Sequence, residues 1–148
     1  MKRIVFLLLA LFSIPLFGQS KEDSLAIKKA AIDYVEGWAT GNVERIQNAV
    51  SPELSKRRVS LAGDIIVVQD MSRSLLCASA LGNAKGVRMP DLTPGKPFNQ
   101  EVRILDIEGL NASVKTWNAK YGFFDYLHLS KAGGKWVVVN VLWDMSVK

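Results

Sequence analysis

The last third of the chain consists of four apolar-rich runs, separated by short polar or glycine-containing stretches. Val, Ile, Trp, Tyr and Phe dominate these runs, a composition typical of β-strands. Gly133 and Gly134 lie between the last two runs and can supply the positive φ angles that a short hairpin loop needs. The pattern predicts an antiparallel meander of four long strands at residues 101–108, 111–120, 123–131 and 135–144.

Upstream of these strands, apolar residues recur at the spacing of amphipathic helices. One long helix is predicted from about Ser20 to Gly41, where glycine can end it. Asn42 can cap a second, short helix at 43–50, and Asp70 can cap a third at 72–81. Residues 54–61 fit either a strand or an extended connection, and 65–68 are expected to be extended. Helices on one face of an antiparallel sheet make an α+β domain.

The closing strand is apolar in a way that predicts self-association. With regular alternation, one face would carry Trp136, Val138, Asn140 and Leu142, and the other Val137, Val139, Val141 and Trp143. A half-exposed antiparallel strand should alternate apolar with polar residues, so one of these faces needs a second cover. We expect an isologous homodimer through the convex face of the sheet. The alternative is that residues 83–100, or a bend between strands, cover this face within one chain.

The N-terminus has the pattern of a secretory signal. Lys2 and Arg3 precede an apolar run at 4–17, and the small residues Gly18 and Ser20 follow it. The run is short for a membrane span, although an uncleaved anchor helix is the alternative. We therefore divide the chain into a signal peptide at 1–20 and a single domain at 21–148. The expected location is exported, periplasmic or secreted, with no membrane contact after cleavage.

Charge and composition exclude several classes of function. The 19 basic and 14 acidic residues give +5, and loss of Lys2 and Arg3 leaves +3. Lys56, Arg57 and Arg58 form one short basic cluster, which is interpreted as a solvated face, so no nucleic-acid partner is expected. The single cysteine, Cys77, is interpreted as a small buried hydrophobe. With one histidine and one cysteine, neither a metal site nor a cofactor is expected.

Two stretches resemble a known superfamily. Residues 33–42 (Asp-Tyr-Val-Glu-Gly-Trp-Ala-Thr-Gly-Asn), together with Ser51-Pro52-Glu53-Leu54, resemble the opening of the nuclear transport factor 2-like proteins. Residues 125–136 fit the phrase Asp-Tyr-x-x-Leu-x-Lys-x-x-Gly-Lys-Trp, which is similar to the closing hairpin of the subfamily named "putative lumazine-binding". The resemblance implies a curved antiparallel sheet wrapped on the long N-terminal helix plus two shorter helices, a cone with an apolar pocket at its wide end.

The same superfamily includes ketosteroid isomerase, scytalone dehydratase, polyketide cyclases and transport adaptors, so its fold does not fix a function. Tyr34 falls where isomerase-like members place a tyrosine that donates a hydrogen bond to a developing oxyanion. Those members also need a carboxylate base shortly after the second helix. Here that region, 54–59, is basic, and arginine stays protonated, which disfavours steroid-isomerase chemistry.

Tyr34 and His128 are the catalytic candidates, and the wider ligand-binding set consists of Tyr34, Trp38, Trp117, Asp125, Tyr126, His128 and Asn140. On a strand, Asp125 and His128 face opposite sides, so this strand alone makes no Asp–His dyad. The leading interpretation is an exported domain that binds a small apolar or aromatic molecule without catalysis. The alternatives are a lyase, isomerase or cyclase that uses Tyr34, and a non-catalytic protein-interaction module. Whether the protein is an enzyme stays open at this point.

The export signal gives a first prediction. Protein recovered from an exporting host should begin near Gln19 or Lys21, because the small residues before these positions suit the cleaving peptidase. N-terminal sequencing checks this, and exported protein that still begins at Met1 would contradict it.

Overall fold

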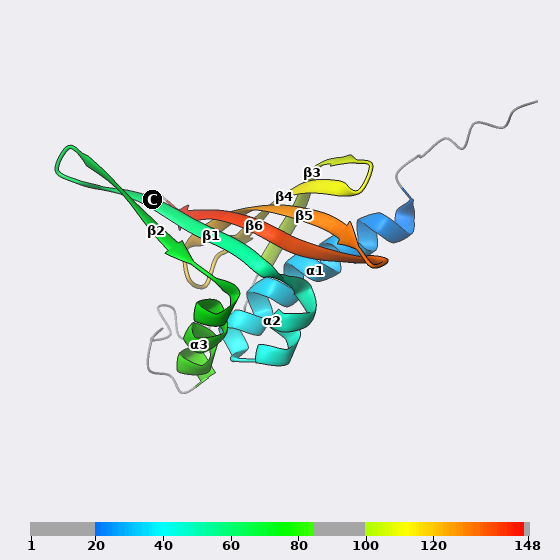
Figure 1. Ribbon diagram of the computed structural model, residues 1–148, viewed down its shortest axis with the longest axis horizontal. Coiled ribbons are helices and arrows are strands. Elements are labelled where there is room, and N and C mark those ends of the chain that lie inside the picture. Colours follow the sequence, from blue (N-terminus) through cyan, green and yellow to red (C-terminus); the bar gives the residue numbers. More distant parts are fainter. Residues whose placement is uncertain (1–19, 85–99, 147–148) are drawn as a thin grey trace, which may run out of the picture.

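The computed structural model describes residues 20–84 and 100–146 (Figure 1). The elements in this part of the chain are α1 (Lys21–Thr40), α2 (Val43–Ala49), β1 (Val50–Ala62), β2 (Ile65–Met71), α3 (Arg73–Ala84), β3 (Gln100–Glu108), β4 (Asn111–Asn118), β5 (Phe123–Ala132) and β6 (Lys135–Met145). The fold is α+β, as expected. The signal segment and most of the 83–100 connection lie outside the described residues. Among the helices described, none is long and apolar enough to cross a membrane.

The first helix begins and ends where the sequence predicts, and the second begins as predicted but ends at Ala49, because Val50 already belongs to β1. The Ser20 hydroxyl accepts a hydrogen bond from the Asp23 backbone N–H at 2.9 Å, and so caps the start of α1. Gly41 ends this helix with a φ of 74°, a left-handed conformation that glycine adopts without steric cost. The Asn42 side chain accepts from the Arg45 N–H and caps α2.

The predicted cap of α3 is wrong. Asp70 belongs to β2, where its carboxylate pairs with the Arg57 guanidinium at 3.2 Å. Ser72 takes the capping position instead, since its carbonyl accepts from the Leu76 N–H and its hydroxyl lies 3.4 Å from the Leu75 nitrogen. Gly82, the predicted end, lies within the helix.

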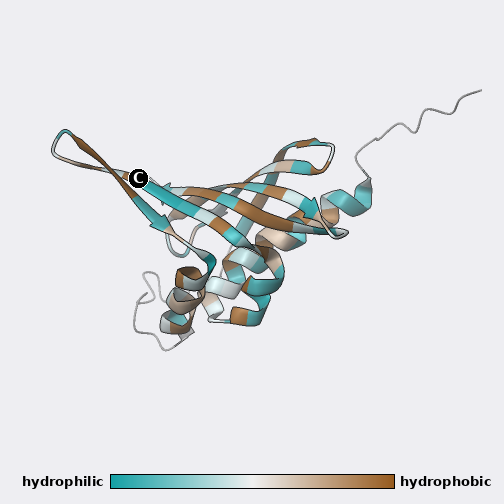
Figure 2. Cartoon of the chain, in the orientation of Figure 1, coloured by the Kyte–Doolittle hydropathy of each residue, from teal (hydrophilic) through white to brown (hydrophobic). Residues whose placement is uncertain are grey.

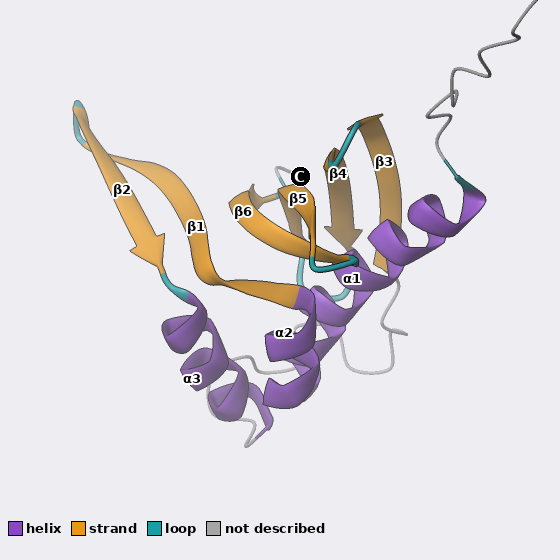
Figure 3. Cartoon of the chain, turned by 45° about the vertical axis from the view of Figure 1, so that its right-hand side comes forward, coloured by secondary structure: helices purple, strands orange, loops and turns teal. Residues whose placement is uncertain are grey.

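The six strands form one sheet in the order β2-β1-β6-β5-β4-β3 (Figure 3). The predicted meander is confirmed, because β3 to β6 pair in sequence and antiparallel. Residues 54–61, which fitted two interpretations, belong to β1. This strand runs parallel to β6, so the expectation of a wholly antiparallel sheet is wrong for this pair. The reason is that α2 delivers the chain to the end of the sheet where β6 begins, as the Val50–Val138 pairing shows.

A β-bulge in β6 changes which residues face the helices. His128 of β5 pairs with Asn140, whereas the next residue, Leu129, pairs with Val138, so Val139 is the extra residue. The regular alternation expected for this strand is therefore wrong beyond Val139. The buried, helix-facing side carries Trp136, Val138, Val141 and Trp143, and the outer side carries Val137, Asn140, Leu142 and Asp144. The outer side of β6 is thus mixed rather than apolar throughout.

The helices cover one face of the curved sheet, and α1 crosses beneath it (Figures 1 and 3). Ile27, Ala31 and Val35 recur along one side of α1 and are buried against the inner residues Val114, Leu127, Val138 and Val141. Burial of each large aliphatic side chain contributes about 1.5–3 kcal/mol. This layer is the main core of the described structure, and Figure 2 shows hydrophobic residues interspersed with hydrophilic ones along the helices and strands.

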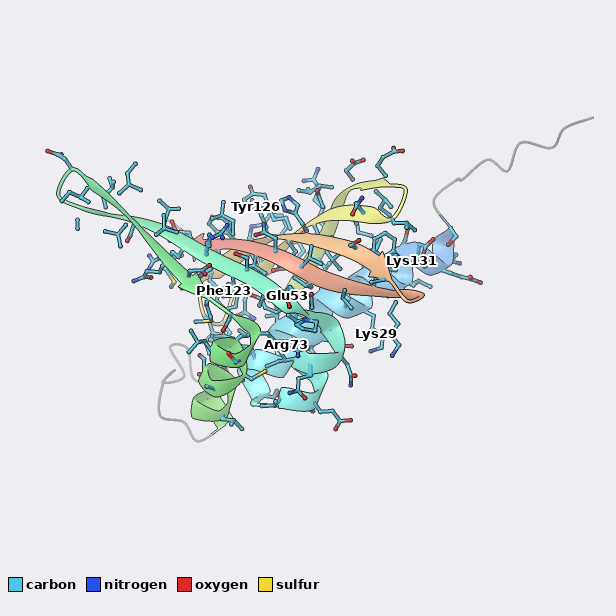
Figure 4. The ribbon with its side chains drawn as sticks, in the orientation of Figure 1. Lys29, Glu53, Arg73, Phe123, Tyr126 and Lys131 are labelled. Atoms are coloured by element: carbon cyan, nitrogen blue, oxygen red, sulfur yellow. The ribbon has the colours of Figure 1, made fainter. Side chains whose placement is uncertain are left out.

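A polar contact fixes the start of α1 to the β5–β6 hairpin. The Lys131 ammonium and the Trp136 indole N–H both donate to the Asp23 carboxylate, each at 2.7 Å. These hydrogen bonds lower the pKa of Asp23 to about 2. Figure 4 shows Lys131 at this end of the hairpin, near the first turns of α1.

Candidate functional site

A cavity of about 230 Å³ lies between α1, α3 and the inner face of the sheet. Most of its lining is apolar or aromatic, as in many small-molecule pockets. The Trp38 ring meets Phe123 edge to face, with ring centroids 5.6 Å apart. The lining residues are Tyr34, Val35, Trp38, Lys56, Met71, Leu76, Ser79, Phe123, Trp143 and Met145.

Two of the lining residues belong to a buried polar cluster. The Lys56 ammonium donates to the Tyr34 hydroxyl at 2.7 Å and to Asp125 Oδ1 at 3.1 Å. The Tyr34 hydroxyl in turn donates to Asp125 Oδ1 at 3.0 Å. Thr116 completes the set, because its hydroxyl donates to Asp125 Oδ2 at 3.2 Å. All four residues are buried, and Asp125 has no exposed surface.

The local sequence explains how these side chains meet. Tyr34 lies seven residues after Ile27 and three after Ala31, so it shares the buried stripe of α1. Lys56 follows Leu54 by two residues on β1, which places both on the inner face of that strand. Asp125 of β5 shares the inner face with Leu127 and Leu129, as the sequence predicts. With Thr116 of β4, the cluster therefore joins a helix to three strands, of which β1 is separated from β5 and β4 by β6.

Burial dominates the protonation of the cluster. Desolvation lowers the pKa of Lys56, and the charge and hydrogen bond of Asp125 act in the opposite direction. Burial, reinforced by the Asp125 charge, raises the pKa of Tyr34 well above its ordinary value, so this phenol keeps its proton. The cluster holds one cation and one anion and carries no net charge.

Aromatic rings shield the lysine. The Lys56 nitrogen lies 4.7 Å from the centroid of the Trp143 ring and 5.5 Å from that of Tyr34, within the range of cation–π attraction. Arg58 lies over the same Trp143 ring and donates to Asp144 at 2.9 Å. Elsewhere in the cavity lining, the Trp38 indole N–H donates to the Ser79 hydroxyl at 3.2 Å.

The structure brings together only some of the candidates from the sequence. Tyr34 and Trp38 line the cavity, and Asp125 lies behind Tyr34 as its hydrogen-bond acceptor. Register and burial place Trp117, Tyr126, His128 and Asn140 on the outer face of the sheet. Figure 4 shows Tyr126 on the side of the sheet away from the helices.

The two catalytic candidates are therefore separated by the sheet. His128 pairs with Asn140 instead of Tyr34, with its ring Nδ1 3.1 Å from the Asn140 amide nitrogen. Across the part of the chain that the structure covers, no group of His, Cys, Asp or Glu side chains is arranged to hold a metal ion.

Lys56 is the residue that sequence reasoning missed. The interpretation of 56–58 as a solvated basic cluster is wrong for Lys56, which is buried, although Arg57 is exposed. The sequence did contain one indication that Lys56 is buried. Side chains alternate with a period of two along a strand, so Lys56 would share the face of the apolar Leu54 if this stretch is a strand. Ser79 and Phe123 also line the cavity without having been candidates.

Comparison with known proteins finds the fold that the sequence resemblance implied. A family model described as "Putative lumazine-binding" matches residues 22–144. An NTF-2-like protein of unknown function from Silicibacter pomeroyi superposes with a TM-score of 0.67 at 15% identity, over 86% of this chain and 99% of that one. An NTF2-like protein of unknown function from Shewanella baltica superposes with a TM-score of 0.61 at 19% identity, over 88% and 100%.

A ketosteroid isomerase-like protein from Erwinia carotovora atroseptica superposes with a TM-score of 0.57 at 15% identity, over 87% of this chain and 100% of that one. At these identities the structural likeness shows the fold alone. No curated protein matches the chain.

The cluster predicts a large difference between two aspartates. Asp125→Asn should destabilise the protein by about 3–5 kcal/mol, because it leaves the buried Lys56 ammonium without its counter-ion. Asp144→Asn is the matched control, since Asp144 pairs with Arg58 near the surface and such pairs contribute about 0–1 kcal/mol. Urea denaturation measures both variants. Equal losses would show that the buried pair contributes no more than the surface pair.

Proposed function

The chain belongs to the putative lumazine-binding family of the nuclear transport factor 2-like superfamily, and we propose that it is an exported protein that binds one small, largely apolar or aromatic molecule in its cavity. The family and the fold support a ligand-binding or isomerase-like domain. The signal-like pattern at residues 1–20 supports export. The observation that carries the proposal is an apolar, aromatic-lined cavity with a small polar cluster in its wall.

The size of the cavity limits the ligand. A dry engineered cavity of about 150 Å³ binds benzene, so the cavity here suits a molecule with one or two rings. Trp38, Phe123 and Trp143 offer ring edges and faces to such a molecule.

The charge balance limits the polar part of the ligand. Tyr34 already donates to Asp125 and accepts from Lys56, so its hydroxyl proton is engaged. The Lys56 ammonium has three hydrogens, of which the described contacts use two. A neutral acceptor such as a carbonyl oxygen can take the third. A carboxylate would instead add a second buried anion beside Asp125, and this negative charge would have no counter-ion of its own.

A lyase, isomerase or cyclase is the second candidate. The contact between Tyr34 and Asp125 favours it, because it gives the tyrosine an acidic partner. However, Asp125 has no exposed surface and is not part of the cavity wall, which makes it a poor base toward a bound molecule. Binding without turnover therefore fits the geometry better.

Benzamide and benzoate test the choice of ligand, because they have nearly the same shape and differ in charge. Benzamide should bind at least about tenfold more tightly than benzoate, a difference of about 1.4 kcal/mol. Ligand-observed NMR titration measures the affinity for both ligands.

Two variants test whether benzamide binds in the cavity. Leu76→Trp, which fills the cavity, should abolish benzamide binding, and Leu75→Trp on the exposed side of the same helix should not. Equal loss in both variants, or equal affinity for both ligands, would contradict the proposal.

We also propose that two copies pair through the outer face of the sheet. Because the bulge at Val139 leaves the outer side of β6 mixed, this pairing is supported by a central apolar patch rather than by a wholly apolar strand. Tyr126 and Leu142 are cross-strand neighbours and are 39% and 46% exposed. Phe124 packs edge to face on Tyr126, and Lys115 lies among these rings and Trp117. Exposed apolar side chains that gather on one face mark interaction surfaces.

Light scattering at micromolar concentration tests the pairing. The protein should have the mass of a dimer, and Leu142→Lys should yield a monomer, because each copy would then bring a charge into the apolar patch. Leu25→Lys is the control, since Leu25 is an exposed leucine on α1. A native monomer, or dissociation by both variants alike, would refute pairing through this face.

A further inference from the structure

Lys56 presents an amine to a cavity whose wall is otherwise almost entirely apolar. Its nitrogen lies among Tyr34, Asp125 and the Trp143 ring. Lys56 is the one lysine among the ten described residues that line the cavity. Lysines that are desolvated in this way can act as nucleophiles toward carbonyl carbon. We propose that Lys56 forms a reversible imine with a small aromatic aldehyde or ketone held in the cavity. This inference rests on the proposed function, of which it names the ligand class.

The cluster supplies what the amine needs before it can react. An ammonium has no free electron pair, so one proton must leave Lys56 first. Asp125 Oδ1 lies 3.1 Å away and can accept that proton directly. The Tyr34 hydroxyl bridges the same two groups at 2.7 and 3.0 Å and offers a second path. Burial favours the neutral form of the lysine, in agreement with the lowered pKa of Lys56.

The addition step balances without an external reagent. The Lys56 nitrogen forms a bond to the carbonyl carbon, and the π electron pair moves to the carbonyl oxygen. The Tyr34 hydroxyl, which lines the cavity, gives its proton to this oxygen and regains one from protonated Asp125. Asp125 then takes a proton from the nitrogen, which leaves a neutral carbinolamine. The hydroxyl group is next protonated in the same way, from Asp125 through the Tyr34 hydroxyl, and the C–O bond breaks to release water as the C=N bond forms. The overall change is ammonium plus carbonyl to iminium plus water.

The product keeps the charge pattern of the resting site. The iminium nitrogen is a cation in the place of the ammonium, and Asp125 is again a carboxylate beside it. Formation of the imine therefore buries no additional charge, whereas a new buried ion would carry a large desolvation penalty. The rings of Tyr34 and Trp143 can stabilise this cation as they do the lysine.

Reductive trapping tests the inference. The purified protein is incubated with benzaldehyde and sodium cyanoborohydride, which converts an iminium into a stable benzylamine, and the labelled lysines are located by peptide mass spectrometry. Lys56 should be labelled at least about tenfold faster than Lys115, because the cavity holds the carbonyl beside the amine. Lys115 is the matched lysine, since it also lies among aromatic rings but on the outer face of the sheet.

Two controls separate this inference from the proposed function. Excess benzamide, which occupies the cavity and forms no imine, should suppress labelling at Lys56 and leave labelling at Lys115 unchanged. Lys56→Arg should remove the fast phase, while Lys115→Arg should retain it. If benzamide binds in the cavity and Lys56 is labelled no faster than Lys115, the imine is refuted and the binding function stands. If benzamide does not bind and no fast labelling occurs, both proposals fail.

Discussion

Asp125 accepts hydrogen bonds from side chains that come from three other elements: Tyr34 of α1, Lys56 of β1 and Thr116 of β4. The meander alone would leave β1 attached to the sheet only through its pairing with β6. The buried carboxylate adds hydrogen bonds that connect β5 to β1, through Lys56, and to α1, through Tyr34. This buried carboxylate therefore helps to fix α1 beneath the sheet beside the cavity, together with the apolar core and the contact of Asp23 with the β5–β6 hairpin.

A gain in stability alone does not explain why this polar cluster is buried. Desolvation of a buried ion pair costs about as much as the attraction returns, and well-packed apolar residues often replace such pairs without loss of stability. A polar cluster of this kind does specify geometry, because an unpaired member is costly. Here it holds one amine at the wall of an apolar cavity, where the third hydrogen of Lys56 can recognise a ligand. The cost of burial is thus consistent with a binding role.

The sequence was informative where structure depends on near neighbours. Ser20, Gly41 and Asn42 act through contacts within a few residues, so both ends of α1 and the start of α2 were predictable. The period of two in β5 correctly separated Asp125 from His128. Lys56 was different, since its partner Asp125 lies 69 residues away and its burial follows from the parallel pairing of β1 with β6. The period of two shared with Leu54 distinguishes it from its exposed neighbour Arg57 only if the stretch is known to be a strand.

The bulge at Val139 links the fold to the chemistry of the cavity. With regular alternation from Trp136, Asn140 and Leu142 would face the helices, and Trp143 would face outward. The extra residue reverses this order, so that Val141 enters the core and Trp143 covers Lys56. The same reversal puts Asn140 and Leu142 on the outer face, beside His128 and Tyr126. One inserted residue therefore decides both the aromatic wall of the cavity and the composition of the surface on which a second copy would pair.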